Sequence, residues 1–126
     1  MTQTQFTIVL VEDDPFLAEI YVLRLEREGF KVIHARSGEE GLKNVLETKP
    51  SLVLLDLVLP KMDGFSVLKE LKANAVTRTI PVVILTNLGE ESDVAKGKKL
   101  GAADYFIKAH LTPSEVAQKV KQLLNL

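Results

Sequence analysis

Six side chains that could do chemistry together stand directly after, or near the end of, short apolar runs of this sequence: Glu12, Asp13, Asp14, Asp56, Thr86 and Lys108. The first three are neighbours, and like charges about 4 Å apart repel by roughly 1 kcal/mol in water and by more inside a protein. A bound cation, a helix N-terminus or plain exposure to solvent would offset that repulsion. Paired carboxylates with a further aspartate form a hard oxygen site of the kind that suits Mg²⁺.

The same residues could accept a phosphoryl group. An aspartate carboxylate is an established nucleophile toward phosphorus. Thr86 offers a hydroxyl donor and Lys108 a positive charge for the transferred group. Acids at a strand-to-helix corner are also commonly helix caps, and Asp14 fits that structural explanation equally well. Asp56 is harder to explain structurally, because a charge within the apolar run SLVLLDL is costly unless it is paired.

The elements that must position these residues alternate along the chain. Five short apolar runs are typical of buried strands: residues 6–11, 31–35, 51–57, 81–85 and 103–107. Amphipathic stretches predict helices at residues 15–28, 37–47, 65–73, 90–100 and from 112 to the C-terminus. Aspartate before proline at 14–15 and capping boxes at SGEE and TPSE mark three of the helix starts.

This alternation indicates an α/β fold, in which a doubly wound parallel sheet carries helices on both faces. Function in such sheets gathers at the carboxyl ends of the strands, near a switch in strand order. The six residues therefore face one crevice if the first, third, fourth and fifth strands are neighbours.

The composition limits other classes of function. The chain has 126 residues, the usual size of one domain, and a net charge of −1, which argues against direct binding of nucleic acid. Cysteine is absent, and His34 and His110 leave little for a histidine-based metal centre. No apolar run approaches the roughly 18 residues of a membrane span, and the N-terminus MTQTQ lacks a signal-peptide pattern. We therefore expect a cytoplasmic protein without a membrane partner.

Four motifs, VEDD, LLDLVLPKMDG, VVILTN and DYFIKA, together resemble the CheY-like receiver domain of two-component response regulators. They stand in the family's order and spacing over essentially the whole chain. The resemblance implies a five-stranded, flavodoxin-like (βα)5 fold with strand order 2-1-3-4-5. It also implies a single receiver domain over residues 1–126, with no output domain.

The resemblance implies a phosphorylation site and a Mg²⁺ site that share residues. Asp56 would be the phospho-acceptor and, with Asp13, a metal ligand. The backbone carbonyl of Val58 would be a further ligand, and Glu12 would act through metal-bound water.

Three further positions match the family's phosphoryl contacts and switch. Lys108 would pair with the phosphoryl group and Thr86 would hydrogen-bond it. Tyr105 would be the switch aromatic whose rotamer follows Thr86. Phosphorylation would then shift the face formed by the fourth helix, the fifth strand and the fifth helix.

These roles predict a signalling switch and not a multiple-turnover enzyme, catalysing only its own phosphotransfer and a slow dephosphorylation. The expected partners are a histidine kinase or phosphotransfer protein, and a downstream target protein or output domain. A phosphorylation-dependent homodimer is left open.

The sequence departs from the family pattern at several positions of the site. Ala109 stands after Lys108 where the family usually has proline, which leaves the conformation of that loop open. Asn87 stands after Thr86 where the family favours a small residue. Val58 and Leu88 occupy positions that tune phosphate lifetime in the family, and neither can orient water by hydrogen bonding.

Two other functions compete with the switch. The altered Lys108–Ala109 loop favours a phosphorylation-independent interaction module, whereas the intact acids argue against it. A Mg²⁺-dependent phosphatase would also use an aspartate nucleophile, but it usually needs a second acid two residues on, where this chain has Val58.

Overall fold

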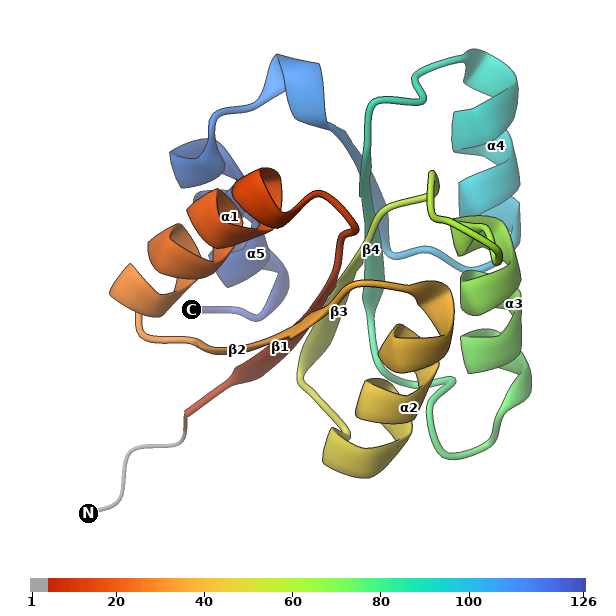
Figure 1. Ribbon diagram of the computed structural model, residues 1–126, viewed down its shortest axis with the longest axis horizontal. Helices are drawn as coiled ribbons and strands as arrows, with labels where there is room; N and C mark the ends of the chain where they lie inside the picture. Colours follow the sequence, from red (N-terminus) through yellow and green to blue (C-terminus); the bar gives the residue numbers. More distant parts are fainter. Residues whose placement is uncertain (1–4) are drawn as a thin grey trace.

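The computed structural model describes residues 5–126 (Figure 1). Its strands are β1 (Thr7–Val11), β2 (Lys31–Ala35), β3 (Leu52–Leu55), β4 (Val82–Thr86) and β5 (Asp104–Ile107). Its helices are α1 (Pro15–Arg27), α2 (Gly38–Thr48), α3 (Gly64–Ala73), α4 (Glu91–Lys99), α5 (Pro113–Leu123) and the single 3-10 turn η1 (Lys108–His110). Each element apart from η1 lies where the alternating sequence pattern predicts it.

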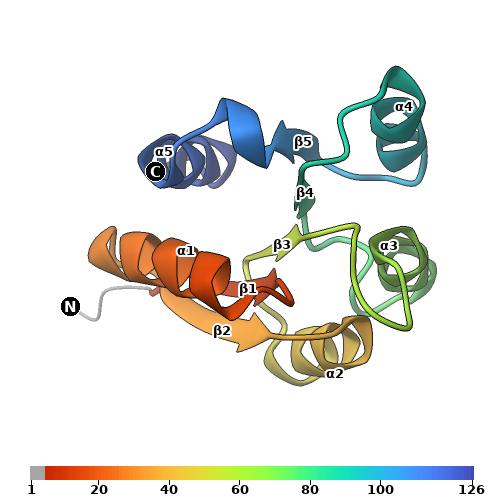
Figure 2. The same ribbon diagram turned by 45° about the horizontal axis from the view of Figure 1, so that its top comes forward.

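The strands form one parallel sheet in the order β2-β1-β3-β4-β5, which confirms the predicted doubly wound fold. Figure 2 shows α1 and α5 on one face of the sheet and α2, α3 and α4 on the other. The strand order switches at β1, because β2 pairs with one of its edges and β3 with the other. Ligand sites of such folds lie at the carboxyl ends of the strands beside this switch.

Both faces of the sheet are buried at its central strands, β1, β3 and β4. Successive side chains of a strand point to opposite faces: Ile8 and Leu10 pack on the side of α1 and α5, whereas Val9 and Val11 pack on the side of α2 and α3. All four residues of β3 are buried between the two layers. That position explains why its sequence is a continuous apolar run and does not alternate.

Side-chain caps fix where the helices begin. Asp14 accepts hydrogen bonds from the N–H groups of Phe16 and Leu17, at 2.9 and 3.3 Å, and so confirms its predicted role as the cap of α1. The reciprocal capping box of Thr112 and Glu115 is also complete.

The capping box predicted for α2 is only half formed. Ser37 Oγ accepts from the Glu40 N–H at 3.1 Å, as expected, but the Glu40 carboxylate accepts from Arg36 and not from Ser37. The third strand is likewise shorter than its apolar run. It ends at Leu55, so Asp56 lies just past β3, still joined to the neighbouring strand by its N–H bond to the Val11 carbonyl at 3.0 Å.

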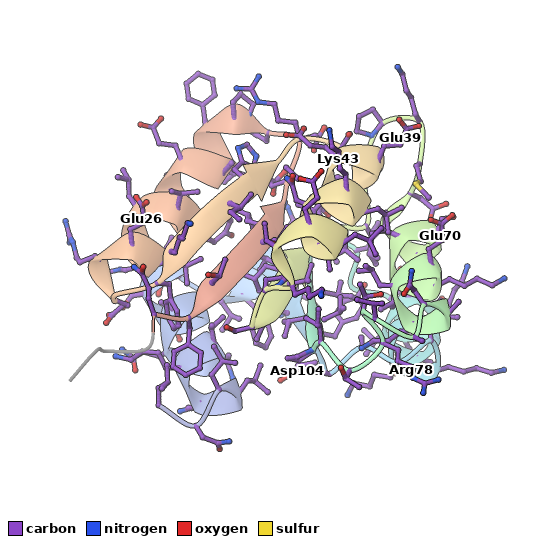
Figure 3. The ribbon with its side chains drawn as sticks, turned by 90° about the horizontal axis from the view of Figure 1, so that it is seen from below. Glu26, Glu39, Lys43, Glu70, Arg78 and Asp104 are labelled. Carbon is purple, nitrogen blue, oxygen red and sulfur yellow. The ribbon has the colours of Figure 1, made fainter. Side chains whose placement is uncertain are left out.

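Charged side chains of both signs cover the outer surface. Glu26 of α1, Glu39 and Lys43 of α2, and Glu70 of α3 project from their helices in Figure 3. Among residues 5–126, no helix has both the length and the apolar character needed to cross a membrane.

Candidate functional site

Glu12 is the first residue after β1, and its backbone is held by β2. Its N–H donates to the Ala35 carbonyl at 3.0 Å, which extends the pairing of the two strands by one residue. Nε2 of His34 lies 2.7 Å from the Glu12 carbonyl oxygen. A carbonyl oxygen only accepts, so this nitrogen is the donor. His34 thereby fixes the point where the chain turns from β1 into the acidic loop.

Three carboxylates meet at the carboxyl ends of β1 and β3. Oxygen atoms of Glu12, Asp13 and Asp56 lie within 4.8 Å of one another. Glu12 is 1% exposed and Asp56 6%, whereas Asp13 is open to solvent. Oxygen donors at this spacing fit a small hard cation, since the buried carboxylates fix the geometry and the exposed one leaves a path of entry.

Lys108 supplies the positive charge in this cluster. Its ammonium donates to Oδ2 of Asp56 at 2.7 Å and also to Oε1 of Glu12, and its side chain is 9% exposed. The lysine comes from η1, directly after β5, so the contact spans the sheet from β1 to β5. One ammonium against three carboxylates leaves the site with a formal charge of −2, and a divalent cation would neutralise it.

At both Glu12 and Lys108, burial and ion pairing shift the pKa in opposite directions. Burial raises the pKa of Glu12, and the hydrogen bonds from Lys108 and the Asp14 N–H only partly counter that effect. For Lys108, burial alone would lower the pKa, but the hydrogen bonds to Asp56 and Glu12 outweigh it and raise the pKa above its ordinary value. The difference has a simple cause: the lysine gains two carboxylates, whereas Glu12 shares one ammonium with Asp56.

The loop after β3 orients the Asp56 side chain through a backbone hydrogen bond. The Val58 N–H donates to Oδ1 of Asp56 at 3.1 Å, and the Gly64 N–H donates to the Leu57 carbonyl at 2.9 Å. A Cβ on Gly64 would collide with the Asp56 carbonyl oxygen and lie 2.6 Å from Leu57 Cα. Only glycine therefore lets α3 start this close to the acidic cluster.

Thr86 and Tyr105 meet at the backbone of Leu88. Thr86 ends β4 fully buried, and its hydroxyl oxygen accepts from the Leu88 N–H at 3.4 Å. The half-buried Tyr105 of β5 donates its hydroxyl to the Leu88 carbonyl. Burial, with the charges of Asp93 and Asp56, raises the pKa of Tyr105 to about 12. The phenol therefore remains a donor well above neutral pH.

The structure brings the predicted residues to one end of the sheet. Glu12, Asp56 and Lys108 are in direct contact, and Asp13 lies beside them. Val58 contributes an N–H to the site, while a role for its carbonyl stays a prediction.

Sequence reasoning missed two side-chain contacts of the site, that of His34 with the Glu12 carbonyl and one between Asn87 and Ala109. Oδ1 of Asn87 accepts from the Ala109 N–H at 3.1 Å. None of the peptide bonds in residues 5–126 is cis, the Lys108–Ala109 bond included. The sequence does show that Asn87 and Ala109 each depart from the family pattern, but nothing in the sequence indicates that the two residues contact each other.

The family model described as the response regulator receiver domain matches residues 8–121. The alkaline phosphatase synthesis transcriptional regulatory protein PhoP of Bacillus subtilis (strain 168) is 40% identical over 118 residues. That match covers 94% of this chain and 48% of PhoP, so the chain spans about half the length of this curated relative.

Two solved structures have the same fold at comparable identity. The signal receiver domain of a signal transduction histidine kinase from Syntrophus aciditrophicus is 36% identical, with a TM-score of 0.86 and coverage of 95% of this chain and 90% of that one. The Mn²⁺-bound form of the response regulator Rcp1 is 30% identical, with a TM-score of 0.83 and coverage of 94% of both chains. The family model, the fold and the acidic cluster agree, and this chain belongs to the response regulator receiver domains of two-component signalling systems.

Proposed function

We propose that this chain is phosphorylated on Asp56 by a histidine kinase or a phosphotransfer protein, and that the modification switches its contacts with a downstream partner. One observation carries the proposal: the nearly buried Asp56 carboxylate, 2.7 Å from the Lys108 ammonium, is part of a three-carboxylate cluster at the switch point of the sheet. A buried aspartate held this way can present a carboxylate oxygen to phosphorus.

Mg²⁺ is the proposed cofactor. Asp13, Asp56 and the Val58 carbonyl would hold it directly and Glu12 through water. When bound, the cation would neutralise negative charge at the acceptor site and on the incoming phosphoryl group. The hard oxygen donors of the cluster suit Mg²⁺, and the relative Rcp1 has been solved with Mn²⁺ bound.

In the proposed transfer, a carboxylate oxygen of Asp56 attacks the phosphorus of a phosphohistidine. The new bond is O–P, the bond that breaks is P–N, and the departing imidazole keeps the electron pair and takes up a proton. Lys108 would shift its hydrogen bonds from the carboxylates to the phosphoryl oxygens, where it stabilises their charge. The Thr86 hydroxyl would leave the weak 3.4 Å bond from Leu88 to donate to the phosphoryl group.

The switch follows from that movement of Thr86. Leu88 is bonded to Thr86 through its N–H and to Tyr105 through its carbonyl, so a shift of Thr86 disturbs the acceptor that holds the phenol. Tyr105 would then change rotamer. The bistable element is the surface of α4, β5 and α5, which carries the downstream contact.

The phosphoryl group on this chain is expected to be long-lived. Val58 and Leu88 are 58% and 38% exposed near the acceptor, and neither side chain can hydrogen-bond an attacking water. Dephosphorylation of the purified phosphoprotein in Mg²⁺, followed by intact mass, measures the lifetime. A half-life of seconds would contradict this expectation.

The similarity to PhoP bears on the partners and the domain boundaries of this chain. PhoP is named as a transcriptional regulatory protein, and this chain matches about half of it. We propose a kinase-type donor for this chain because Asp56, Lys108 and the other two carboxylates lie together at one site. A single receiver domain without an output domain stays a prediction.

Binding of beryllofluoride, a phosphoryl mimic, tests the proposed function. Titration in Mg²⁺, followed by amide NMR, should produce saturable shifts in Thr86, Tyr105 and α4. Asp56→Asn should abolish them. Asp63→Asn is the matched control, because Asp63 is an exposed cap of α3 and asparagine caps equally well. A protein that binds Mg²⁺ but shows no response to beryllofluoride would favour the phosphorylation-independent interaction module.

A further inference from the structure

The turn that carries Lys108 is not capped by its own side chains. Ile107 stands at the N-cap of η1 and makes no capping hydrogen bond. The Leu111 N–H closes the turn on the Lys108 carbonyl at the long distance of 3.4 Å. The first N–H groups of any helix have no acceptor within it. The Ala109 N–H near the start of η1 therefore has no acceptor within the turn.

Asn87 provides that acceptor from the loop between β4 and α4. Its Oδ1 accepts from the Ala109 N–H at 3.1 Å. Thr86 pairs with Ile107 in the sheet, so the chains that leave β4 and β5 start as neighbours (Figure 2). The hydrogen bond joins the residue after Thr86 to the residue after Lys108.

The bond requires both of the residues that occupy these positions. Proline at 109 would have no N–H to donate. Alanine or glycine at 87 would have no side-chain acceptor. Asn87 and Ala109, which both depart from the family pattern, are therefore the two partners of a single hydrogen bond.

We propose that Asn87 is a positioning residue for Lys108: by fixing η1 through Ala109, it holds the lysine backbone where the ammonium reaches Asp56. The inference rests on the proposed function of Asp56 and Lys108. Lysine has a long side chain with large rotamer freedom, so an anchored backbone limits where its ammonium can lie. Asn87 acts on the phosphoryl site only through this turn.

The Asn87→Ala variant tests the bond and its consequence together. Both residues are exposed, so water competes and the effect belongs in the lower part of the range for neutral hydrogen bonds. We expect beryllofluoride affinity in Mg²⁺ to fall by about two- to fivefold. Mg²⁺ affinity without beryllofluoride should not fall, because the carboxylates come from other loops. Hydrogen exchange of the Ala109 amide should become faster.

Asn74→Ala is the matched control. Asn74 Oδ1 accepts from the Val76 N–H at 2.8 Å in the loop before β4, which is the same kind of exposed asparagine-to-backbone bond. Its loss should leave beryllofluoride affinity unchanged. Equal losses in Asn74→Ala and Asn87→Ala would show a general effect of loop loosening and would overturn the positioning role.

A double-mutant cycle with Ala109→Pro separates positioning from direct contact. The proline has no N–H, so Asn87→Ala should have no further effect on beryllofluoride affinity in that background. An equal effect in both backgrounds, or no effect of Asn87→Ala in either, overturns the inference. If Ala109→Pro does not fold, the Ala109 amide decides: unchanged exchange in Asn87→Ala overturns it. Failure of the unmodified protein to bind beryllofluoride would instead refute the proposed function.

Discussion

Substitution of Asp13 by asparagine should change stability and metal affinity in opposite directions. Asp13, Glu12 and Asp56 place oxygen atoms within 4.8 Å of one another. At that distance each pair of full charges costs about 0.9 kcal/mol in the dielectric of water, which is the relevant limit because Asp13 faces solvent. Two repulsions are relieved, and an attraction to the Lys108 ammonium is lost. The metal-free protein should gain about 1 kcal/mol in its free energy of unfolding.

The same substitution should weaken Mg²⁺ binding by at least about tenfold, because even indirect supporting groups of metal sites contribute that much. Each tenfold loss of affinity removes about 1.4 kcal/mol of stabilisation at saturating Mg²⁺. The variant should therefore be more stable than the unmodified protein without Mg²⁺ and equally or less stable in excess Mg²⁺. Urea unfolding at both conditions measures this crossing.

Asp14→Asn is the control for that experiment. It makes the same change of charge one residue away, while asparagine keeps the cap of α1. Its stability should stay within about 0.5 kcal/mol of the unmodified protein in both conditions. Unchanged Mg²⁺ affinity in Asp13→Asn, or a less stable metal-free variant, would refute the assignment of Asp13 as a metal ligand in a repulsive cluster.

Three further substitutions test other parts of the account. Lys108→Met leaves the carboxylates of Glu12 and Asp56 without their positive partner, so it should lower the free energy of unfolding by about 3 kcal/mol in the absence of Mg²⁺. Urea unfolding measures this loss, and a loss below about 1 kcal/mol would contradict the bridging role of Lys108. The stabilising effect of the protonated Tyr105 phenol should be complete below its ordinary pKa of 10 and be lost as the pH rises through the raised pKa of about 12. The difference in absorbance titration between the unmodified protein and Tyr105→Phe measures that pKa. A midpoint near 10 would contradict the raised pKa of Tyr105. Gly64→Ala collides with the backbone after β3 and should cost about 2 kcal/mol in thermal or urea unfolding; a neutral effect would mean that the loop can move away.

The parts of the fold that depend on local chemistry could be predicted from the sequence. Asp14 before Pro15 starts α1 because a side-chain acceptor and a preset backbone angle act within three residues. The burial of β3 could be predicted as well, because its continuous apolar run is itself a local feature of the sequence. Its end at Leu55 could not be predicted, because the apolar run continues past Asp56 to Leu57 and nothing local marks where the strand pairing stops.

Contacts between residues that lie far apart in the sequence were harder to predict from the sequence. The sequence predicts Lys108 at the site, but its bridge between Glu12 and Asp56 depends on how β5 sits relative to β1. The bond between Asn87 and Ala109 is a second case. Each residue alone is a departure from a pattern, and only the register of β4 with β5 makes them partners.

Phosphorylation of Asp56 is the central claim, and intact-mass analysis after incubation with acetyl phosphate and Mg²⁺ tests it most directly. We predict one phosphoryl adduct on the unmodified protein and on the capping control Asp63→Asn. The adduct should be absent in Asp56→Asn and when Mg²⁺ is chelated. An adduct that persists in Asp56→Asn, or no adduct at all under conditions in which Mg²⁺ binds, would contradict the account.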